Sequence, residues 1–194
     1  LSKTFRSLFE NKNYRNGAIS QVCCVGAQIM CWTYIYQYAE AIGISSKTAA
    51  SYQFMSFILF LCGRAFGTYF LRFINSGKLL MFYAIFAFVL MLGVIFIEGV
   101  IGLYFLVGVS FFMSVMFPTI YGISLGKLNN EESKIGSAGL VMAIVGGALM
   151  PKLQATIIDI GGYAVNDIRF LGVSEINLSF ILPALCFIYI ARYG

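Results

Sequence analysis

The sequence predicts an all-α membrane protein with six transmembrane helices, and three observations lead to that prediction. Of the 194 residues, 60% are hydrophobic and only 11% are charged, which leaves too few polar side chains to cover a soluble domain of this size. Six apolar runs each come close to the roughly 20 residues that cross a bilayer. The charged residues lie mostly between these runs.

The six spans are expected, in chain order, at residues 17–39, 48–71, 79–97, 99–126, 135–158 and 176–192. The third reads LLMFYAIFAFVLMLGVIFI, which is typical of a helix that faces lipid around most of its circumference. The fourth follows a very short turn at Glu98 and is long for a straight crossing. We therefore expect the fourth span to tilt, or to bend near Pro118.

Residues 1–16 are expected to form a cytoplasmic linker or a short interfacial helix, ahead of a six-helix unit at 17–194. Apolar residues from Leu1 to Phe9 fall on one helical face of this segment, and cations such as Lys3 and Arg15 make it polar elsewhere. Because the chain begins with Leu1 rather than Met and shows no signal-peptide cleavage site, we expect a part of a longer chain.

Charge placement predicts the orientation in the membrane. If residue 1 is cytoplasmic, the inner segments hold nine cations and the outer loops hold two, which is the bias of the positive-inside rule. Both ends of the unit are then cytoplasmic, and the loop at 159–175 is external. The inner cations are Lys3, Arg6, Lys12, Arg15, Arg72, Lys78, Lys127, Lys134 and Arg192, and the outer ones are Lys47 and Arg169.

Residues 111–159 hold two apolar runs on either side of a charged patch. Pro118 removes a backbone donor from the first run, which is tolerated at membrane depth where protein or a water-lined cavity satisfies the freed carbonyl. Gly139, Ala143 and Gly147 are spaced by four in the second run, so a neighbouring backbone can approach closely there. Both runs are therefore expected to face the protein interior.

The residue inventory argues against an enzyme, a metal site, a cofactor or a nucleic-acid partner. The chain has no histidine and no cluster of carboxylates, and its net charge of +5 is not gathered on one face with aromatics. All five cysteines lie inside the predicted spans, where they are expected to be small buried hydrophobes rather than disulfide partners.

A polar and aromatic stripe recurs at helical spacing along the first span. It consists of Gln21, Gln28, Trp32 and Tyr36, and a similar seam on the fourth span consists of Ser110, Ser114, Phe117 and Tyr121. An aromatic ring stacked on the apolar face of a sugar, with an amide bonding its hydroxyls, is one use of such a stripe. The other is adhesion between helices, with glutamine bonding across them and Trp and Tyr at the membrane surface.

Two cations lie within spans. Arg64 stands between Gly63 and Gly67, a G-x-x-x-G spacing that indicates close helix packing, and it needs buried partners unless its side chain extends to the membrane surface. Lys152 lies two turns from Asp159, so it can pair with Asp159 or extend outward.

Four segments in combination resemble the carboxy-terminal half of the fucose:proton symporter family of the major facilitator superfamily. They are VGAQIMCWTYIYQYAE at 25–40, GRAFGTYFL at 63–71, MFPTIYGISLGKL at 116–128 and GGALMPKLQATIID at 146–159. The resemblance implies a carrier of twelve helices, with a sugar cavity between two six-helix halves, in the cytoplasmic (inner) membrane. This chain would supply one half, and the amino-terminal half would be its missing partner.

The resemblance also implies roles for individual residues in fucose or hexose:proton symport. Gln28 and Trp32 would contact the monosaccharide, with Phe117 and Tyr121 secondary, although Phe117 has no hydroxyl to donate. The proton-coupling carboxylates would lie in the missing half. Structural or gating roles would fall to Arg64, Gly63, Gly67, Pro118, Gly139 and Gly147.

Two alternatives to half a carrier stay open from the residues alone. A self-standing six-helix channel or exporter would match its polar stripe to itself across the two-fold axis of a homodimer. A purely structural membrane subunit would depend on the stripe for stability and not for transport.

Overall fold

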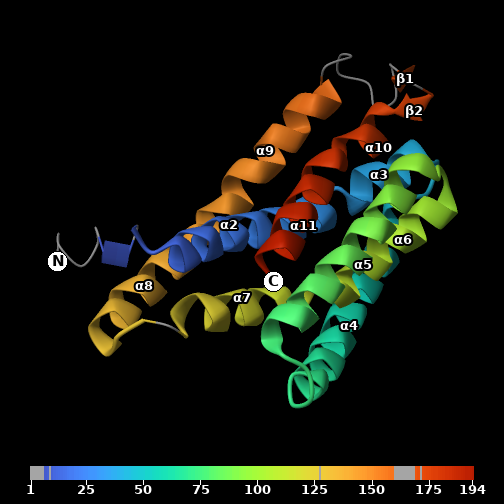
Figure 1. The fold of residues 1–194 in the computed structure, drawn as a ribbon. Coiled ribbons are helices and arrows are strands. Elements are labelled where there is room, and N and C mark those ends of the chain that lie inside the picture. The colour runs from blue at the N-terminus through green and yellow to red at the C-terminus, as the bar shows by residue number, and fades with distance from the viewer. Residues whose placement is uncertain (1–6, 9, 127, 160–168, 171) are drawn as a thin grey trace.

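The computed structural model describes residues 7–8, 10–126, 128–159, 169–170 and 172–194. In that part of the chain, six helical segments are long and apolar enough to cross a membrane, which confirms the predicted spans. Residues 1–6 and 9 of the predicted amino-terminal segment, and the middle of the predicted external loop at 160–168, lie outside the described residues. Figure 1 shows the helices as a bundle with a short strand pair at one end.

Two of the six spans are continuous helices and four are interrupted. The continuous ones are α4 (Ser46–Phe70) and α5 (Ser76–Phe96). The interrupted ones are α2 (Lys12–Thr33) with α3 (Ile35–Ala41), α6 (Val100–Met113) with α7 (Met116–Leu125), α8 (Asn130–Met142) with the 3-10 turn η1 (Ala143–Val145) and α9 (Gly146–Ile158), and α10 (Glu175–Ser179) with α11 (Ile181–Tyr193). The strands β1 (Arg169–Phe170) and β2 (Val173–Ser174) pair antiparallel, with Arg169 opposite Ser174.

Several helices begin earlier than the apolar runs predict, because polar residues cap them. The Asn11 side chain accepts hydrogen bonds from the backbone of Asn13 and Tyr14, and Asn75 accepts one from Gly77. Asn129 and Glu132 form a capping box at the start of α8. Hydropathy locates the apolar middle of a span, whereas the cap fixes its first turn.

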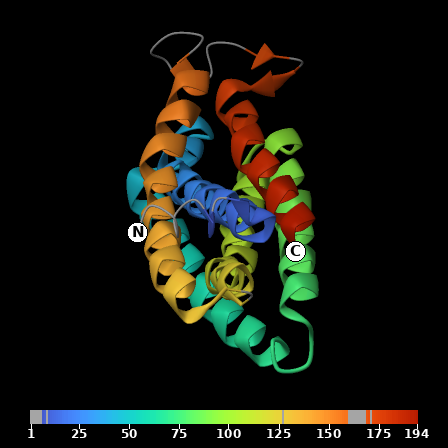
Figure 2. The same cartoon turned by 60° about the vertical axis from the view of Figure 1, so that its left-hand side comes forward.

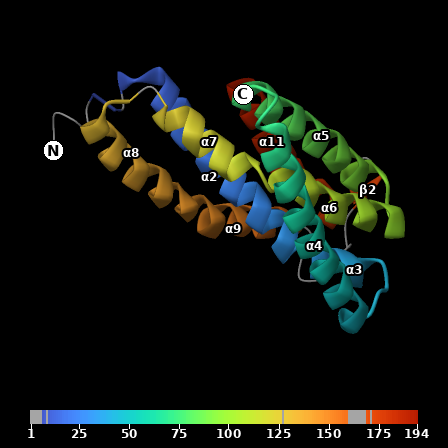
Figure 3. The same cartoon turned by 90° about the horizontal axis from the view of Figure 1, so that it is seen from below.

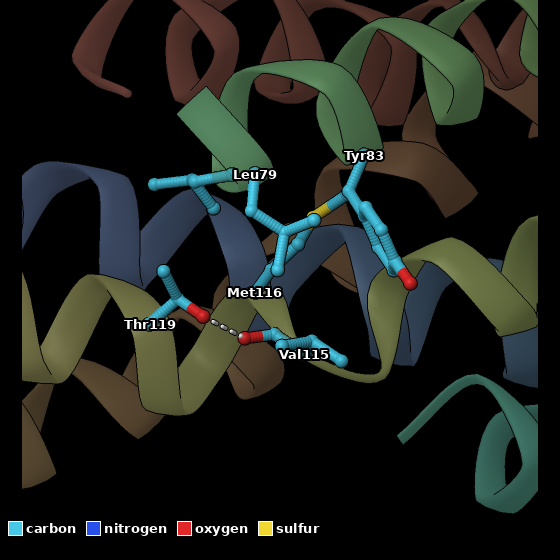
Figure 4. A pocket seen from close by; sticks show the side chains of 6 residues that line it. Leu79, Tyr83, Val115, Met116 and Thr119 are labelled. Atoms are coloured by element: carbon cyan, nitrogen blue, oxygen red, sulfur yellow. Dashed lines mark hydrogen bonds between the residues drawn. The ribbon is translucent and has the colours of Figure 1, made fainter. Parts of the chain in front are cut away.

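The fourth span is interrupted at Ser114 and Val115, just before Pro118, as predicted. Pro118 falls in the first turn of α7, where a missing N–H leaves no helical bond unmade. Ser114 Oγ donates to the Phe111 carbonyl and Thr119 Oγ1 to the Val115 carbonyl, both at 2.7 Å, and such local bonds bend helices. Figure 4 shows the Thr119 bond beneath Leu79 and Tyr83 of α5, so the bend is packed against that helix.

The core lies where α2, α5, α6 and α11 meet. Its largest fully buried side chains include Tyr38, Met91, Leu106, Phe180 and Phe187. Figure 2 shows α2 running between α8 and α9 on one side and α11 on the other. By contrast, α4 and the fifth span are largely uncovered: 17% of the most apolar stretch of α4 is buried within the chain, and 22% of that of the fifth span. Figure 3 shows α4 on one side of α2 and α7, and α8 and α9 on the other.

A buried polar cluster joins the helices at the end that carries the strands. Asn177 Nδ2 donates to the Val94 carbonyl at 2.7 Å and lies 3.4 Å from Tyr38 Oη, and Ser174 Oγ donates to Asn177 Oδ1 at 2.8 Å. The Tyr38 hydroxyl in turn donates to the Ile97 carbonyl. These bonds tie α3, α5 and α10 together. Glu175 is buried beside Ser174, and neither of its carboxylate oxygens is hydrogen-bonded to a residue that the structure describes.

Candidate substrate-binding site

Trp32 is the centre of an aromatic cluster between α2, α4 and α6. Its indole Nε1 donates to Ser110 Oγ at 3.2 Å, and its ring meets Phe57 and Phe60 edge-on, with centroids 5.1 and 5.2 Å away. The indole N–H is thus committed within the chain. The half-buried ring is what remains for a ligand.

Gln28 lies one helical turn before Trp32 on the same face of α2. It is half-buried, and its amide makes no hydrogen bond within the described part of the chain. A free amide offers two donors and one acceptor oxygen, which suits the hydroxyls of a sugar. Gln28 and Trp32 are therefore brought together as an amide beside a ring.

The rest of the predicted stripe divides between two environments. Gln21 is fully buried, and neither atom of its amide has a hydrogen-bond partner among the described residues. Tyr36 follows the interruption at Tyr34 and is 41% exposed. The stripe therefore does not form one continuous wall. Only its middle, Gln28 and Trp32, is both polar and accessible to a ligand.

Arg64 joins the Trp32 cluster from α4. Its guanidinium carbon lies 5.8 Å from the centroid of the Phe60 ring, which is a cation–π distance. Arg64 is exposed, and no carboxylate pairs with it in the part of the chain that the structure describes. An unpaired cation at membrane depth is costly, so Arg64 either meets a counter-charge from outside these residues or extends to the membrane surface.

Phe57 and Phe60 were not predicted as site residues, although a signal was present. Together with Gln53 and Arg64 they recur at i, i+4, i+7 and i+11, which places them on one face of α4. That face borders Trp32, and the Gln53 side-chain oxygen is buried there without a hydrogen-bond partner. Two phenylalanines in an apolar helix did not stand out from their neighbours in the sequence.

Phe117 and Tyr121 lie on α7, nearer the end where α2 begins. The Trp32–Ser110 bond and the contact of Gly17 with Ser124 fix the antiparallel register of these two spans. Tyr121 packs against a small separate cluster of Leu8, Tyr14 and Leu140, whereas Phe117 packs against the main core. The structure therefore does not bring Tyr121 together with Trp32.

Gly63 and Gly67 let α4 lie directly on the interrupted fourth span. A Cβ on Gly63 would overlap the Phe111 carbonyl, and one on Gly67 would overlap the Val115 side chain. The spacing noted in the sequence thus coincides with a backbone-to-backbone approach. Pro118 itself is exposed, on the same helix as the half-buried Phe117 and Tyr121.

The glycines of the fifth span make contacts of two kinds. Gly139 faces the Tyr14 hydroxyl, and Gly147 faces the side chains of Val25 and Ile29. The closest backbone approach is at Gly146 instead, where a Cβ would stand 2.5 Å from the Val22 carbonyl oxygen. The spacing by four therefore indicated Gly147 where the structure has its neighbour Gly146. The reason is that the 3-10 turn η1 rotates the helical face between Gly139 and α9.

Nothing in the described residues gathers three or more side chains that could hold a metal ion. Together, the contacts around Trp32 define the candidate site as the open face formed by Gln28, Trp32, Phe57, Phe60 and Arg64. It offers a free amide, three aromatic rings packed edge to face and one cation.

Comparison with known proteins gives relatives that are transporters rather than enzymes, as the sequence predicted. The chain is 48% identical over 187 residues to the L-fucose-proton symporter of Haemophilus influenzae, covering 96% of this chain and 42% of the relative. It is 32% identical over 188 residues to the L-fucose-proton symporter of Escherichia coli, covering 40% of that protein. A glucose/galactose transporter of Brucella abortus is 32% identical over 181 residues, with 40% of its length covered.

A crystal structure of a major facilitator superfamily transporter, FucP, in the outward conformation has the same fold. It superposes with a TM-score of 0.87 at 32% identity, over 100% of this chain and 44% of that one. No protein-family model matches the chain. The chain thus spans less than half the length of the relatives that it matches.

Proposed function

Because this chain is homologous to part of the fucose:proton symporters of the major facilitator superfamily, we propose that it forms the carboxy-terminal half of a sugar:proton symporter. The observation that carries the proposal is the free amide of Gln28 beside the Trp32 ring, on a face that the chain leaves uncovered. The substrate class is a monosaccharide. The names of the relatives point to fucose, glucose or galactose for those proteins.

Binding in this proposal combines a stacked ring with a hydrogen-bonding amide. The Trp32 ring covers the apolar face of the sugar, and the Gln28 amide bonds the hydroxyls along its edge. Phe117 and Tyr121 serve a later part of the pathway, toward the end where α2 begins. The remaining wall of the cavity comes from a second six-helix half.

Proton coupling is assigned to that second half. In the described spans, carboxylates occur near helix ends, at Glu40, Glu131, Glu132 and Glu175, whereas Arg64 lies well within α4. A carboxylate presented by the other half next to Arg64 would supply the missing counter-charge. Its protonation would then change the interaction between the halves.

Residues 1–194 alone are therefore expected not to concentrate sugar. Vesicles containing the purified chain should show no uptake of labelled fucose, glucose or galactose under an imposed proton gradient, because one half supplies only one wall of the cavity. Vesicles with the full-length carrier are the positive control. Saturable, gradient-driven uptake by residues 1–194 would instead favour the homodimer alternative.

The proposed orientation places both ends of this unit in the cytoplasm. In a cysteine-free background, Asn129→Cys between α7 and α8 and Ser46→Cys at the start of α4 should react with an impermeant thiol reagent from opposite sides of the membrane. Both positions are exposed in the structure, so access does not limit labelling. Labelling of both from one side contradicts the six-span arrangement, and the reverse sidedness contradicts the orientation.

A further inference from the structure

A polar cavity opens between the beginning of α2 and the end of α11. It has a volume of about 300 Å³ and is lined by Asn16, Tyr189, Arg192 and Tyr193. That volume lies at the lower end of small-molecule pockets. The cavity is remote from the Trp32 cluster, from which α2 separates it by four helical turns.

The floor of this cavity is built by close packing of α2, α7 and α11. Gly17 leaves room for Ser124 and Tyr193, whose hydroxyls lie 3.0 Å apart, and Ser124 Oγ lies 2.7 Å from the Ile120 carbonyl oxygen. One turn beyond Asn16 on the same face of α2, Ser20 is fully buried, and its hydroxyl has no hydrogen-bond partner among the residues that the structure describes. Polar side chains therefore continue along the contact between α2 and α11 beneath the cavity.

The groups around the opening are free to bind a ligand. Arg192 is exposed and makes no ion pair among the described residues, and the Asn16 amide and Tyr189 hydroxyl make no hydrogen bond there. A guanidinium, an amide and a phenol together present the donors that a phosphate group accepts. Arg192 lies in the last turn of α11, where a cation interacts favourably with the helix dipole. The dipole explains why a cation stands there, but it does not explain the cavity beside it.

Further cations surround the opening. Arg15 precedes Asn16 and is exposed, and Lys78 is exposed on α5 next to Gly77, which abuts Gly194 at the end of α11. All of these residues lie at the end of the spans that the positive-inside bias assigns to the cytoplasm. Anionic lipids of the cytoplasmic leaflet place their phosphates at this level, and basic pockets between spans bind such headgroups.

We propose that this cavity binds the phosphate of an anionic phospholipid headgroup from the cytoplasmic leaflet. Arg192 pairs with the phosphate, and Asn16 and Tyr189 donate hydrogen bonds to its oxygens. The bound headgroup bridges α2 and α11, and so stabilises the contact between the first and last spans. This site does not depend on which substrate the protein carries.

The test uses the full-length protein in detergent, with the melting temperature followed as phosphatidylglycerol is added. The half-maximal lipid concentration should rise about fivefold in Arg192→Gln, the loss expected for one cation near the membrane surface. Asn16→Asp, which adds a negative charge at an exposed position, should weaken the effect as well. Arg72→Gln is the matched control: Arg72 is an exposed cation just after the end of α4, it does not line the cavity, and its loss should leave the half-maximal lipid concentration unchanged.

Three results would overturn the proposal. An equal rise of the half-maximal lipid concentration in Arg192→Gln and Arg72→Gln would mean that the lipid responds to surface charge in general and not to a site. Equal stabilisation by phosphatidylcholine would mean that the acyl chains act without the headgroup charge. Equal stabilisation by glycerol phosphate or inorganic phosphate, at matched concentration, would identify a soluble ligand instead of a lipid.

Discussion

Gly63→Ala is expected to destabilise the protein markedly, although it adds only one methyl group. The new Cβ would overlap the Phe111 carbonyl of α6, and a backbone atom within a helix cannot move aside as a flexible side chain can. Overpacking of this kind costs about 1 to 3 kcal/mol, which exceeds the gain of up to about 1 kcal/mol from replacing glycine by alanine in a helix. The free energy of unfolding in mixed detergent micelles measures the loss.

Gly108→Ala is the matched control, since Gly108 is also a helical glycine within a span. The nearest atom to its Cβ is Leu90 Cδ1 at 3.7 Å, an ordinary contact. Its stability should stay equal or rise slightly through helix propensity. If both variants had the same stability, α4 would not lie on α6 as closely as the structure has it.

Trp32→Ala in the full-length carrier is expected to weaken sugar binding by roughly 5- to 150-fold. Removing a ring from the cavity wall costs about 1 to 3 kcal/mol of burial and stacking. Equilibrium binding of the labelled sugar measures the change. Gln28→Ala should weaken binding in the same assay, because the sugar hydroxyls lose their amide partner.

The same substitution also removes packing, because the Trp32 ring contacts Phe57 and Phe60 and its N–H bonds Ser110. Phe112→Ala controls for this effect, since Phe112 stacks on Phe86 at 5.4 Å, away from Gln28. Phe112→Ala should lower the melting temperature and leave sugar affinity intact. A Trp32→Ala protein with a lower melting temperature and unchanged affinity would show that the stripe only holds helices together.

The spans and the bend near Pro118 were predictable because they depend on local properties of the chain. Apolar length decides whether a segment crosses a membrane, and a proline inside an apolar run favours a new helix start there, because its missing N–H costs nothing in a first turn. The helix starts were less predictable. Residues such as Lys12 and Asn130 are polar and still helical, because a cap and not hydropathy decides the first turn.

The site was only partly predictable because it depends on which helix faces meet. Gln28 and Trp32 stood out as an amide and a ring in apolar surroundings, whereas Phe57 and Phe60 resembled any lipid-facing residue. The separation of Tyr121 from Trp32 follows from the antiparallel register of α2 and α7, which no spacing within either span reveals. Asn177 and Tyr38 meet across 139 positions of sequence, so their bond has no local signal at all.

Gly63 and Gly67 place α4 against the interruption in the fourth span, since Gly63 meets Phe111 just before it and Gly67 meets Val115 within it. The unbroken helix α4 therefore packs on α6 as far as the joint, whereas α7 beyond the joint packs on α2 and α5. A tilt of α7 therefore has to break its packing on α2 and α5, while α6 can stay seated on α4. The joint of the fifth span at η1 is held by a different helix, since η1 and α9 pack on α2 and Gly146 meets the Val22 carbonyl there. The two interrupted spans can therefore bend separately, one against α4 and α5 and the other against α2.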